Sequence, residues 1–180
     1  MIYHLRRATR ADCPEVLRLY REAAARPDSV WNENYPTQFE IDEDFAAGTL
    51  FVFCLGAEYD PALPSSVIGA ISVVPQNEYD DFDCWSPSDG SHREIARITI
   101  ARSCSGRGLA ARMVGAMLGR LFASGVCAVR LSVAKLNPAA QATYRKLGFA
   151  FVGETTMYGN DYYLCEILKE DSGCTPIRYF

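Results

Sequence analysis

The sequence predicts one α+β domain. Its apolar residues form short runs typical of strands, and between them lie longer runs with helical spacing. The chain shows no internal repeat and no low-complexity stretch. With 180 residues, it can bury roughly 70% of the surface that its unfolded form exposes. We therefore expect a single domain over residues 1–170 and a non-periodic C-terminal tail at 171–180.

The N-terminal part predicts a strand followed by a helix. Residues 3–8 suit a short strand, and the charges follow too short an apolar stretch for a signal peptide. Asp12 then stands at the position of a helix N-cap, ahead of Pro14 and a periodic apolar run. We expect this helix over residues 14–24.

The next segment predicts a loop, a short helix and a pair of strands. Residues 28–38 carry aromatic side chains without clear periodicity, and a helix at 41–47 would end at Gly48. The β-rich runs 50–55 and 67–74 are separated by a proline-containing loop, which indicates an antiparallel pair.

The C-terminal half predicts strands and helices in alternation after a long acidic loop at 75–91. The expected order is a strand at 94–101, a helix at 106–123, a strand at 126–133, a helix at 137–146, and strands at 149–157 and 162–168 joined by a turn at Asn160-Asp161. Gly115 and Gly119 each cost the first of these helices up to about 1 kcal/mol against alanine, which predicts close packing on another element.

The composition disfavours several classes of function. The seven cysteines are scattered and never spaced as Cys-x-x-Cys, which favours reduced thiols in the cytoplasm over a disulfide framework or a zinc site. With two histidines, we expect no metal centre. The net charge of −4 disfavours nucleic acid as a partner, and no apolar run reaches the roughly 20 residues of a membrane span.

The turn Ser105-Gly106-Arg107-Gly108-Leu109-Ala110, between a predicted strand and a predicted helix, suits phosphate binding. Glycines let the backbone approach an anion, and the unpaired amides of a helix start attract it. A glycine turn that only starts the helix is the alternative. The spacing also satisfies G-x-G-x-x-A, but a dinucleotide site needs a carboxylate at the end of the next strand, and a P-loop needs Gly-Lys-Ser/Thr. Neither is present.

Two motifs resemble the GNAT superfamily of acyl-CoA-dependent N-acetyltransferases. Residues 94–100 with the 105–110 turn resemble its motif A, in which Gln/Arg-x-x-Gly-x-Gly/Ala binds the CoA pyrophosphate. Gly108 and Ala110 match this pattern, whereas Ser105 replaces the usual Gln or Arg. Residues 137–149 resemble motif B in their Asn, Ala, Tyr and Gly-Phe positions. The resemblance covers nearly the whole chain.

This resemblance implies the GNAT fold, a twisted mixed sheet with flanking helices. Its central strands, 94–101 and 126–133, would splay apart to admit the pantetheine arm of acetyl-CoA. The pyrophosphate would lie on the 105–110 turn, and the thioester oxygen near the backbone amides of Ile98 and Ile100. Asn137 would contact the pantetheine. Strand periodicity places Glu94, Ala96, Ile98 and Ile100 on one face.

The resemblance also indicates two catalytic residues. Tyr144 lies where the family often places a general acid near the CoA sulfur, and a phenol of pKa about 10 can protonate a departing thiolate. The alternative is that Tyr144 only packs against Phe149. Glu94 resembles the catalytic base of histone acetyltransferases in the superfamily, with a solvated carboxylate as its alternative. His92 is the next candidate base.

In this family the acceptor enters opposite the CoA, between the segment after the first helix and the loop before the motif A strand. Here these stretches hold Trp31, Tyr35, Asp80, Asp81 and Trp85, with a further acidic run at 42–44. Carboxylates among aromatic rings suit a cation with an apolar body. An acidic loop that only maintains solubility is the alternative.

We therefore expect an N-acetyltransferase that moves an acetyl group from acetyl-CoA to a primary amine of a small cationic molecule. A protein N-terminal or lysine acetyltransferase is one alternative. A non-catalytic acyl-CoA-binding sensor domain is another. The protein would be a monomer or a homodimer.

Overall fold

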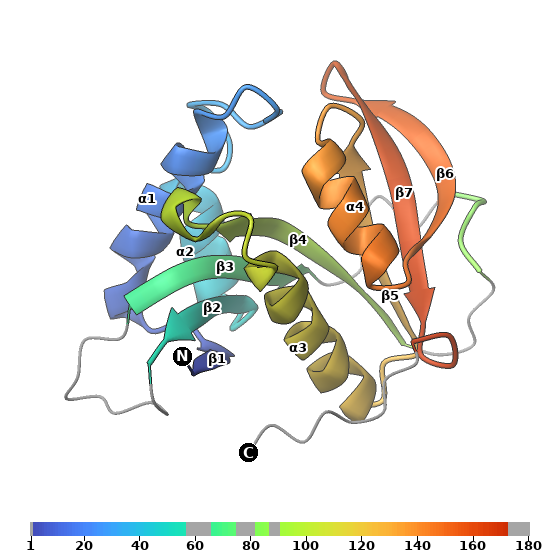
Figure 1. Ribbon diagram of the computed structural model, residues 1–180, viewed down its shortest axis with the longest axis horizontal. Helices are drawn as coiled ribbons and strands as arrows, with labels where there is room; N and C mark the ends of the chain where they lie inside the picture. The colour runs from blue at the N-terminus through green and yellow to red at the C-terminus, as the bar shows by residue number, and fades with distance from the viewer. Residues whose placement is uncertain (1, 57–65, 75–81, 87–90, 173–180) are drawn as a thin grey trace.

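The computed structural model describes residues 2–56, 66–74, 82–86 and 91–172, which form one seven-stranded sheet with helices on both faces (Figure 1). The strands are β1 (Tyr3–Arg7), β2 (Leu50–Leu55), β3 (Ser66–Val74), β4 (His92–Ile100), β5 (Ala128–Ala134), β6 (Ala150–Met157) and β7 (Asn160–Leu168). The helices are α1 (Cys13–Ala24), α2 (Gln38–Ala46), α3 (Leu109–Ala123) and α4 (Pro138–Lys146). The predicted order of elements is therefore confirmed.

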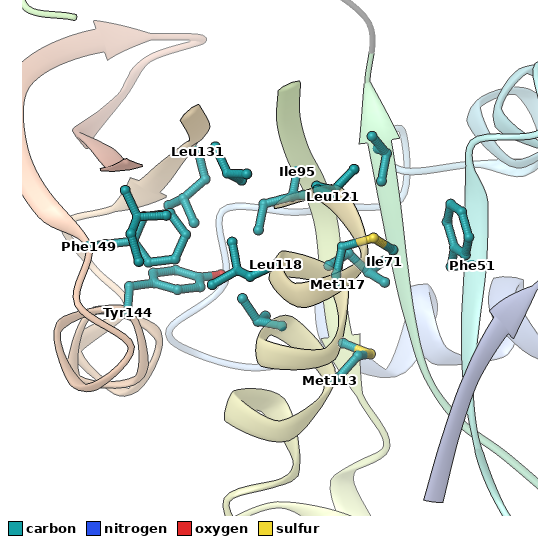
Figure 2. Close-up of a cluster of buried hydrophobic side chains, with 14 of the residues drawn as sticks. Phe51, Ile71, Ile95, Met113, Met117, Leu118, Leu121, Leu131, Tyr144 and Phe149 are labelled. Carbon is teal, nitrogen blue, oxygen red and sulfur yellow. The ribbon is translucent and has the colours of Figure 1, made fainter. Parts of the chain in front are cut away.

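Each face of the sheet has its own apolar core. On one face, α3 and α4 cover a cluster that Figure 2 shows running from Phe51 of β2, past Met113 and Met117 of α3, to Tyr144 and Phe149. On the other face, α1 and α2 cover a second cluster, and Figure 1 shows α2 behind β2 and β3. None of the helices among the described residues combines the length and the apolar character of a membrane span.

The sheet is mixed because β4 and β5 run parallel, whereas the other neighbouring strands are antiparallel. The strands follow the order β1-β2-β3-β4-β5-β7-β6. The pairing of β4 with β5 is restricted to three residue pairs, from His92 with Ala128 to Glu94 with Arg130. Beyond Glu94 the two strands separate, which confirms the predicted splayed centre of the sheet.

A β-bulge interrupts β4 after the strands separate. Ser72 of β3 pairs with Ala96, but Ala70 pairs with Thr99, so β4 contains one residue more than its partner over this stretch. Arg97 lies within the bulge and has a φ of 50°, in the left-handed region that few residues other than glycine adopt. The bulge increases the bend of β4 where it leaves β5.

The bulge also changes which side chains share a face. Ile95, Ile98 and Ile100 all pack in the cluster under α3, although regular alternation would place residues 95 and 98 on opposite faces. The prediction that Glu94, Ala96, Ile98 and Ile100 share a face is therefore wrong. The extra residue reverses the alternation, so Glu94 faces the α1 and α2 side while Ile98 and Ile100 face α3.

Two local predictions also need correction. Helix α3 begins at Leu109 and not at residue 106, because Gly106 and Gly108 have positive φ angles. The β6–β7 turn lies at Tyr158-Gly159 and not at Asn160-Asp161, since Met157 pairs with Asn160 and both turn residues have positive φ, as a type I′ turn requires. Asp12 stands at the N-cap of α1 as predicted, but its side chain forms no capping hydrogen bond to that helix. This side chain instead accepts hydrogen bonds from Arg6 and Thr9 and so fixes the chain before the helix.

Candidate active site

A cavity of about 660 Å³ lies where β4 and β5 separate. Its walls come from the segment after α1, from β4, from the end of β5 and the start of α4, and from the β6–β7 hairpin. Six residues expected to bind or react line it: Trp31, Tyr35, Glu94, Ile98, Asn137 and Tyr144. Because Glu94 and Tyr144 come from opposite sides of the sheet, groups entering from the two sides can meet in this cavity.

The turn predicted to bind pyrophosphate lies at the start of α3. Its exposed residues are Ser105, Gly106, Arg107 and Gly108, after which Leu109 is buried and Ala110 half-buried. Gly106 and Gly108 have φ angles of 74° and 70°, which an L side chain rarely adopts. The Gly108 carbonyl accepts the amide of Arg112 at 3.1 Å, and the first amides of α3 have no intrahelical acceptor. An exposed turn with helix amides behind it fits a pyrophosphate.

The edge of β4 is the second feature that was expected to meet acetyl-CoA. From Ile95 onward, β4 has no partner in β5, so the peptide groups on this edge are open to a ligand. Ile98 lines the cavity, whereas Ile100 is 7% exposed and is not part of its lining. Of the two residues predicted near the thioester, Ile98 thus lies beside the cavity and Ile100 lies in the core.

Asn137 joins the cavity to α4. Its side-chain oxygen accepts the amide of Ala140 at 3.0 Å and so caps the helix, as the sequence Asn137-Pro138 favours. The side-chain amide nitrogen of Asn137 is therefore the group that can donate a hydrogen bond to a ligand in the cavity.

Tyr144 is buried on α4 but lines the cavity. Its ring meets Phe149 edge to face, with ring centres 5.7 Å apart, and Figure 2 shows its hydroxyl oxygen directed away from Phe149 toward the middle of the core. Burial raises the pKa of the Tyr144 phenol above its usual range. The side chain is thus a packing residue and, at neutral pH, also a protonated donor.

Glu94 lies at the point where the two central strands separate. It forms the last pair of β4 with β5, opposite Arg130, and it is half-buried in the cavity wall. His92 is 8% exposed and does not line the cavity. Of the two candidate bases, Glu94 is therefore the one with access to a substrate.

Aromatic side chains form the opposite wall. Trp31 packs edge to face on the fully buried Tyr20, with ring centres 5.5 Å apart, and Tyr35 is 40% exposed at the rim. Tyr158 and Tyr162 of the β6–β7 hairpin also line the cavity. The rings thus come from two segments far apart in the sequence.

Trp85 is not part of the cavity lining. The guanidinium carbon of Arg130 lies 4.8 Å from the centre of its ring, and Arg130 forms a buried ion pair with Glu166 at 2.9 Å. The Ser86 amide donates to the other oxygen of Glu166 at 3.0 Å. Trp85 is therefore attached to β5 and β7 and not placed at the expected acceptor wall.

Asp42 and Asp44 of α2 each pair with an arginine and do not line the cavity. Asp42 pairs with Arg10 on the exposed surface, and Asp44 is buried against Arg97. Asp80 and Asp81 lie outside the described residues. Among the residues that the structure describes, Asp28 and Glu94 supply the carboxylates of the cavity.

Sequence reasoning missed several cavity residues, including Arg26, Arg97, Tyr158 and Tyr162. Arg97 carried a usable signal, because an arginine inside an apolar strand needs a specific partner when it is buried. Tyr158 and Tyr162 carried none, since their place at the cavity depends on how β7 pairs with β5.

Comparison with known proteins gives a family and several relatives. Residues 14–149 match the model of the acetyltransferase (GNAT) family. An L-methionine sulfoximine/L-methionine sulfone acetyltransferase from Pseudomonas paraeruginosa is 24% identical over 88% of this chain and 86% of its own. The spermidine N-acetyltransferase of Vibrio cholerae, solved with CoA and spermine, has a TM-score of 0.69 at 20% identity, covering 94% of this chain and 97% of its own. A Salmonella typhimurium protein solved with its cofactor acetyl-CoA has a TM-score of 0.66 at 16% identity, covering 93% and 94%.

Proposed function

The chain belongs to the acetyltransferase (GNAT) family, and we propose that it moves the acetyl group of acetyl-CoA onto the primary amine of a small cationic molecule. Acetyl transfer from acetyl-CoA is the reaction of the family. The observation that carries the proposal is the cavity at the split of the sheet, which Glu94 and Tyr144 both line.

The two candidate catalytic side chains have complementary tasks. An alkylammonium ion holds its proton about 3.4 pK units above neutral pH, which corresponds to about 4.6 kcal/mol. Glu94 accepts that proton, directly or through water, so that the amine attacks the thioester carbonyl as a free base. A positioned base typically contributes 10²- to 10⁴-fold, which is comparable with this cost.

Tyr144 acts on the leaving group. As the C–N bond forms and the C–S bond breaks, the electron pair of the C–S bond passes to sulfur, and Tyr144 donates its proton to the thiolate. Burial keeps the phenol protonated because it raises the pKa. Backbone amides on the open edge of β4, beside Ile98, support the carbonyl oxygen as charge develops on it.

The cavity walls support a cationic acceptor. Trp31, Tyr35, Tyr158 and Tyr162 offer ring faces, each worth about 0.5 to 2 kcal/mol to a nearby cation. The charge of Arg97 is neutralised by Asp44. The remaining charged side chains of the described lining are Arg26, Asp28 and Glu94, which leaves one carboxylate in excess. The spermine bound by the Vibrio cholerae relative is a cation of this type.

An amino acid with an apolar side chain is the second candidate acceptor. The Pseudomonas relative acetylates methionine derivatives, which carry a carboxylate beside the amine. Arg26 lines the cavity and donates to the backbone carbonyl of Ile100 at 2.7 Å, so its other donors can meet such a carboxylate.

A thiol-release assay with acetyl-CoA separates these candidates. We expect polyamines and other apolar cations to give the highest kcat/KM, with a fall at high salt because charge attraction is screened. The Asp28→Asn variant should raise KM for a cationic acceptor about fivefold, and the pair Asp80→Asn with Asp81→Asn tests the acidic loop. If methionine sulfone exceeds every cation, the second candidate holds. Preference for peptide amines would indicate a protein acetyltransferase. Binding of acetyl-CoA without any transfer would indicate a sensor domain and overturn the proposal.

A further inference from the structure

Arg97 connects three segments of the acceptor side through one guanidinium. Its Nε and Nη2 donate to the two carboxylate oxygens of Asp44, at 2.8 and 2.7 Å, and its Nη1 donates to the Tyr35 hydroxyl at 3.4 Å. Asp44 belongs to α2, Arg97 to the bulge of β4, and Tyr35 to the segment that carries Trp31. A displacement of any one segment therefore disturbs the other two.

This junction lies in the interior. The side chains of Arg97 and Asp44 are 12% and 9% exposed, and the Ser72 hydroxyl donates to the same carboxylate. Tyr20 is fully buried on the same side of the sheet and supports Trp31. A buried and bidentate ion pair is held in one geometry, because a shifted partner leaves an uncompensated charge away from water.

The backbone of Arg97 requires such support. A φ of 50° is unfavourable for an arginine, and strain of this kind persists where the surrounding structure fixes the residue. The conformation matters for the cavity because the bulge turns Ile98 toward the α3 side, within the stretch of β4 that no longer pairs with β5.

We infer that Arg97 is the positioning residue of this active site, which fixes the bulge of β4 and the Tyr35 wall relative to each other. The inference rests on the proposed function, since it assigns the bulge to the acetyl donor and the wall to the amine. The guanidinium donors of Arg97 bond to Asp44 and Tyr35, so in this inference Arg97 acts through these groups and not on a reacting atom. Asp44 orients its guanidinium, and the guanidinium in turn sets the distance between donor and acceptor.

Lysine at this position provides the discriminating variant. Arg97→Lys keeps the positive charge but loses the planar guanidinium. Only the guanidinium can bond Asp44 at two points and reach Tyr35 at the same time. Arg10 provides a matched control, because its partner Asp42 lies on the same helix, α2, as Asp44. The side chains of Arg10 and Asp42 are 65% and 43% exposed. Arg10→Lys thus makes the same change in an arginine–aspartate pair outside the cavity.

Hydrogen exchange tests the coupling without any activity. In Arg97→Lys we expect the amides of residues 95–100 and those of residues 29–36 to exchange at least tenfold faster together, with no change in either segment of Arg10→Lys. Faster exchange in one segment alone, or in neither, overturns the inference. This result is independent of the acceptor, so it decides the role of Arg97 even if the wild-type protein acetylates no amine and the proposed function fails.

Kinetics test the consequence for the reaction. With the best acceptor, Arg97→Lys should lower kcat about tenfold and raise the acceptor KM, while the Kd for CoA stays within twofold. A lower Tm, with kcat and KM unchanged at temperatures well below that Tm, would mean a structural role only and would overturn the inference.

If Arg97→Lys does not fold, a second variant, Tyr35→Phe, removes one contact of the Arg97 guanidinium at the exposed rim. We then expect a threefold rise in the acceptor KM at constant kcat, and a wild-type KM overturns the inference.

Discussion

The proposed site has two ends that are built in different ways. The proposed cofactor end is one local turn, residues 105–110, which is not part of the cavity lining and whose backbone conformation is set by Gly106 and Gly108. The acceptor end combines side chains of α1, the segment after it, β4 and the β6–β7 hairpin. A short motif can therefore encode the first end, whereas the second exists after the chain has folded. Substitutions at the two ends should differ accordingly in which substrate they affect.

The largest effect is expected at the cofactor end, in Gly108→Val. Valine at a φ of 70° is strained by about 1 to 2 kcal/mol, and its side chain would occupy the space in front of the helix amides. We predict at least a 100-fold loss of acetyl-CoA affinity by calorimetry in a folded protein, since a Cβ at Gly108 meets nothing within 4 Å. Gly119→Ala, inside α3 with equal space, is the control and should keep full affinity. Unchanged affinity in folded Gly108→Val would contradict the site assignment.

Between the two ends, Tyr144→Phe should lower kcat about 100-fold with little change in acetyl-CoA affinity, because the ring remains and the proton donor is lost. Since burial raises the phenol pKa, its ionisation should not reduce wild-type kcat below pH about 10. The steady-state rate of thiol release at saturating concentrations of both substrates measures kcat. Tyr163→Phe removes a hydroxyl from a ring outside the cavity lining and serves as the control. A Tyr144→Phe kcat within threefold of wild type would leave Tyr144 a packing role.

At the acceptor end, Glu94→Gln should lower kcat/KM about tenfold at neutral pH and remove the rising acidic limb of its pH profile. The effect is smaller than the usual contribution of a base because a cavity of this size admits water as an alternative carrier. Measuring the pH profile with two acceptors of different amine pKa shows whether the acidic limb belongs to the enzyme or to the substrate. A limb that moves with the amine pKa and persists in Glu94→Gln belongs to the substrate.

The smallest effect is expected from Trp85→Leu. Trp85 lies on Arg130 and outside the cavity lining, so the acceptor KM should stay within twofold of wild type. Loss of the cation–π contact should cost about 1 kcal/mol, which lowers the Tm by about 2 to 4 °C. Scanning calorimetry and acceptor titration measure the two quantities. A large rise in KM at unchanged Tm would return Trp85 to the acceptor wall.

Most of the elements could be predicted because strand and helix patterns are local, whereas the splayed sheet was expected from the resemblance of two motifs to the GNAT superfamily. The errors occur where tertiary pairing decides. Asn160 and Asp161 are good turn formers, but the pairing of β6 with β7 puts the turn at Tyr158-Gly159. The bulge at Arg97 depends on the register between β3 and β4, which period-two alternation along one strand does not contain.

The site shows the same division. Gly108 and Tyr144 could be chosen as candidates from their motifs, since each lies within one local turn or helix. The carboxylates expected to attract the acceptor could not be judged in this way. Asp44 bonds to Arg97, 53 residues further along the chain, and Asp42 to Arg10, so neither is free for a ligand. The charge of an isolated segment is thus a poor guide to recognition, because folding pairs it with distant residues.

The short pairing of β4 with β5 has a thermodynamic consequence. The two halves of the sheet share three residue pairs, so the junction is held mainly by the core beneath α3 and α4. The proposed cosubstrate arm in the gap would contact both halves, and it would bind the folded chain but not the unfolded one. By mass action, acetyl-CoA at 100 times its Kd adds about 2.7 kcal/mol to the free energy of unfolding. If acetyl-CoA binds there as proposed, its supply would set the resistance of each molecule to proteolysis as well as its rate of turnover.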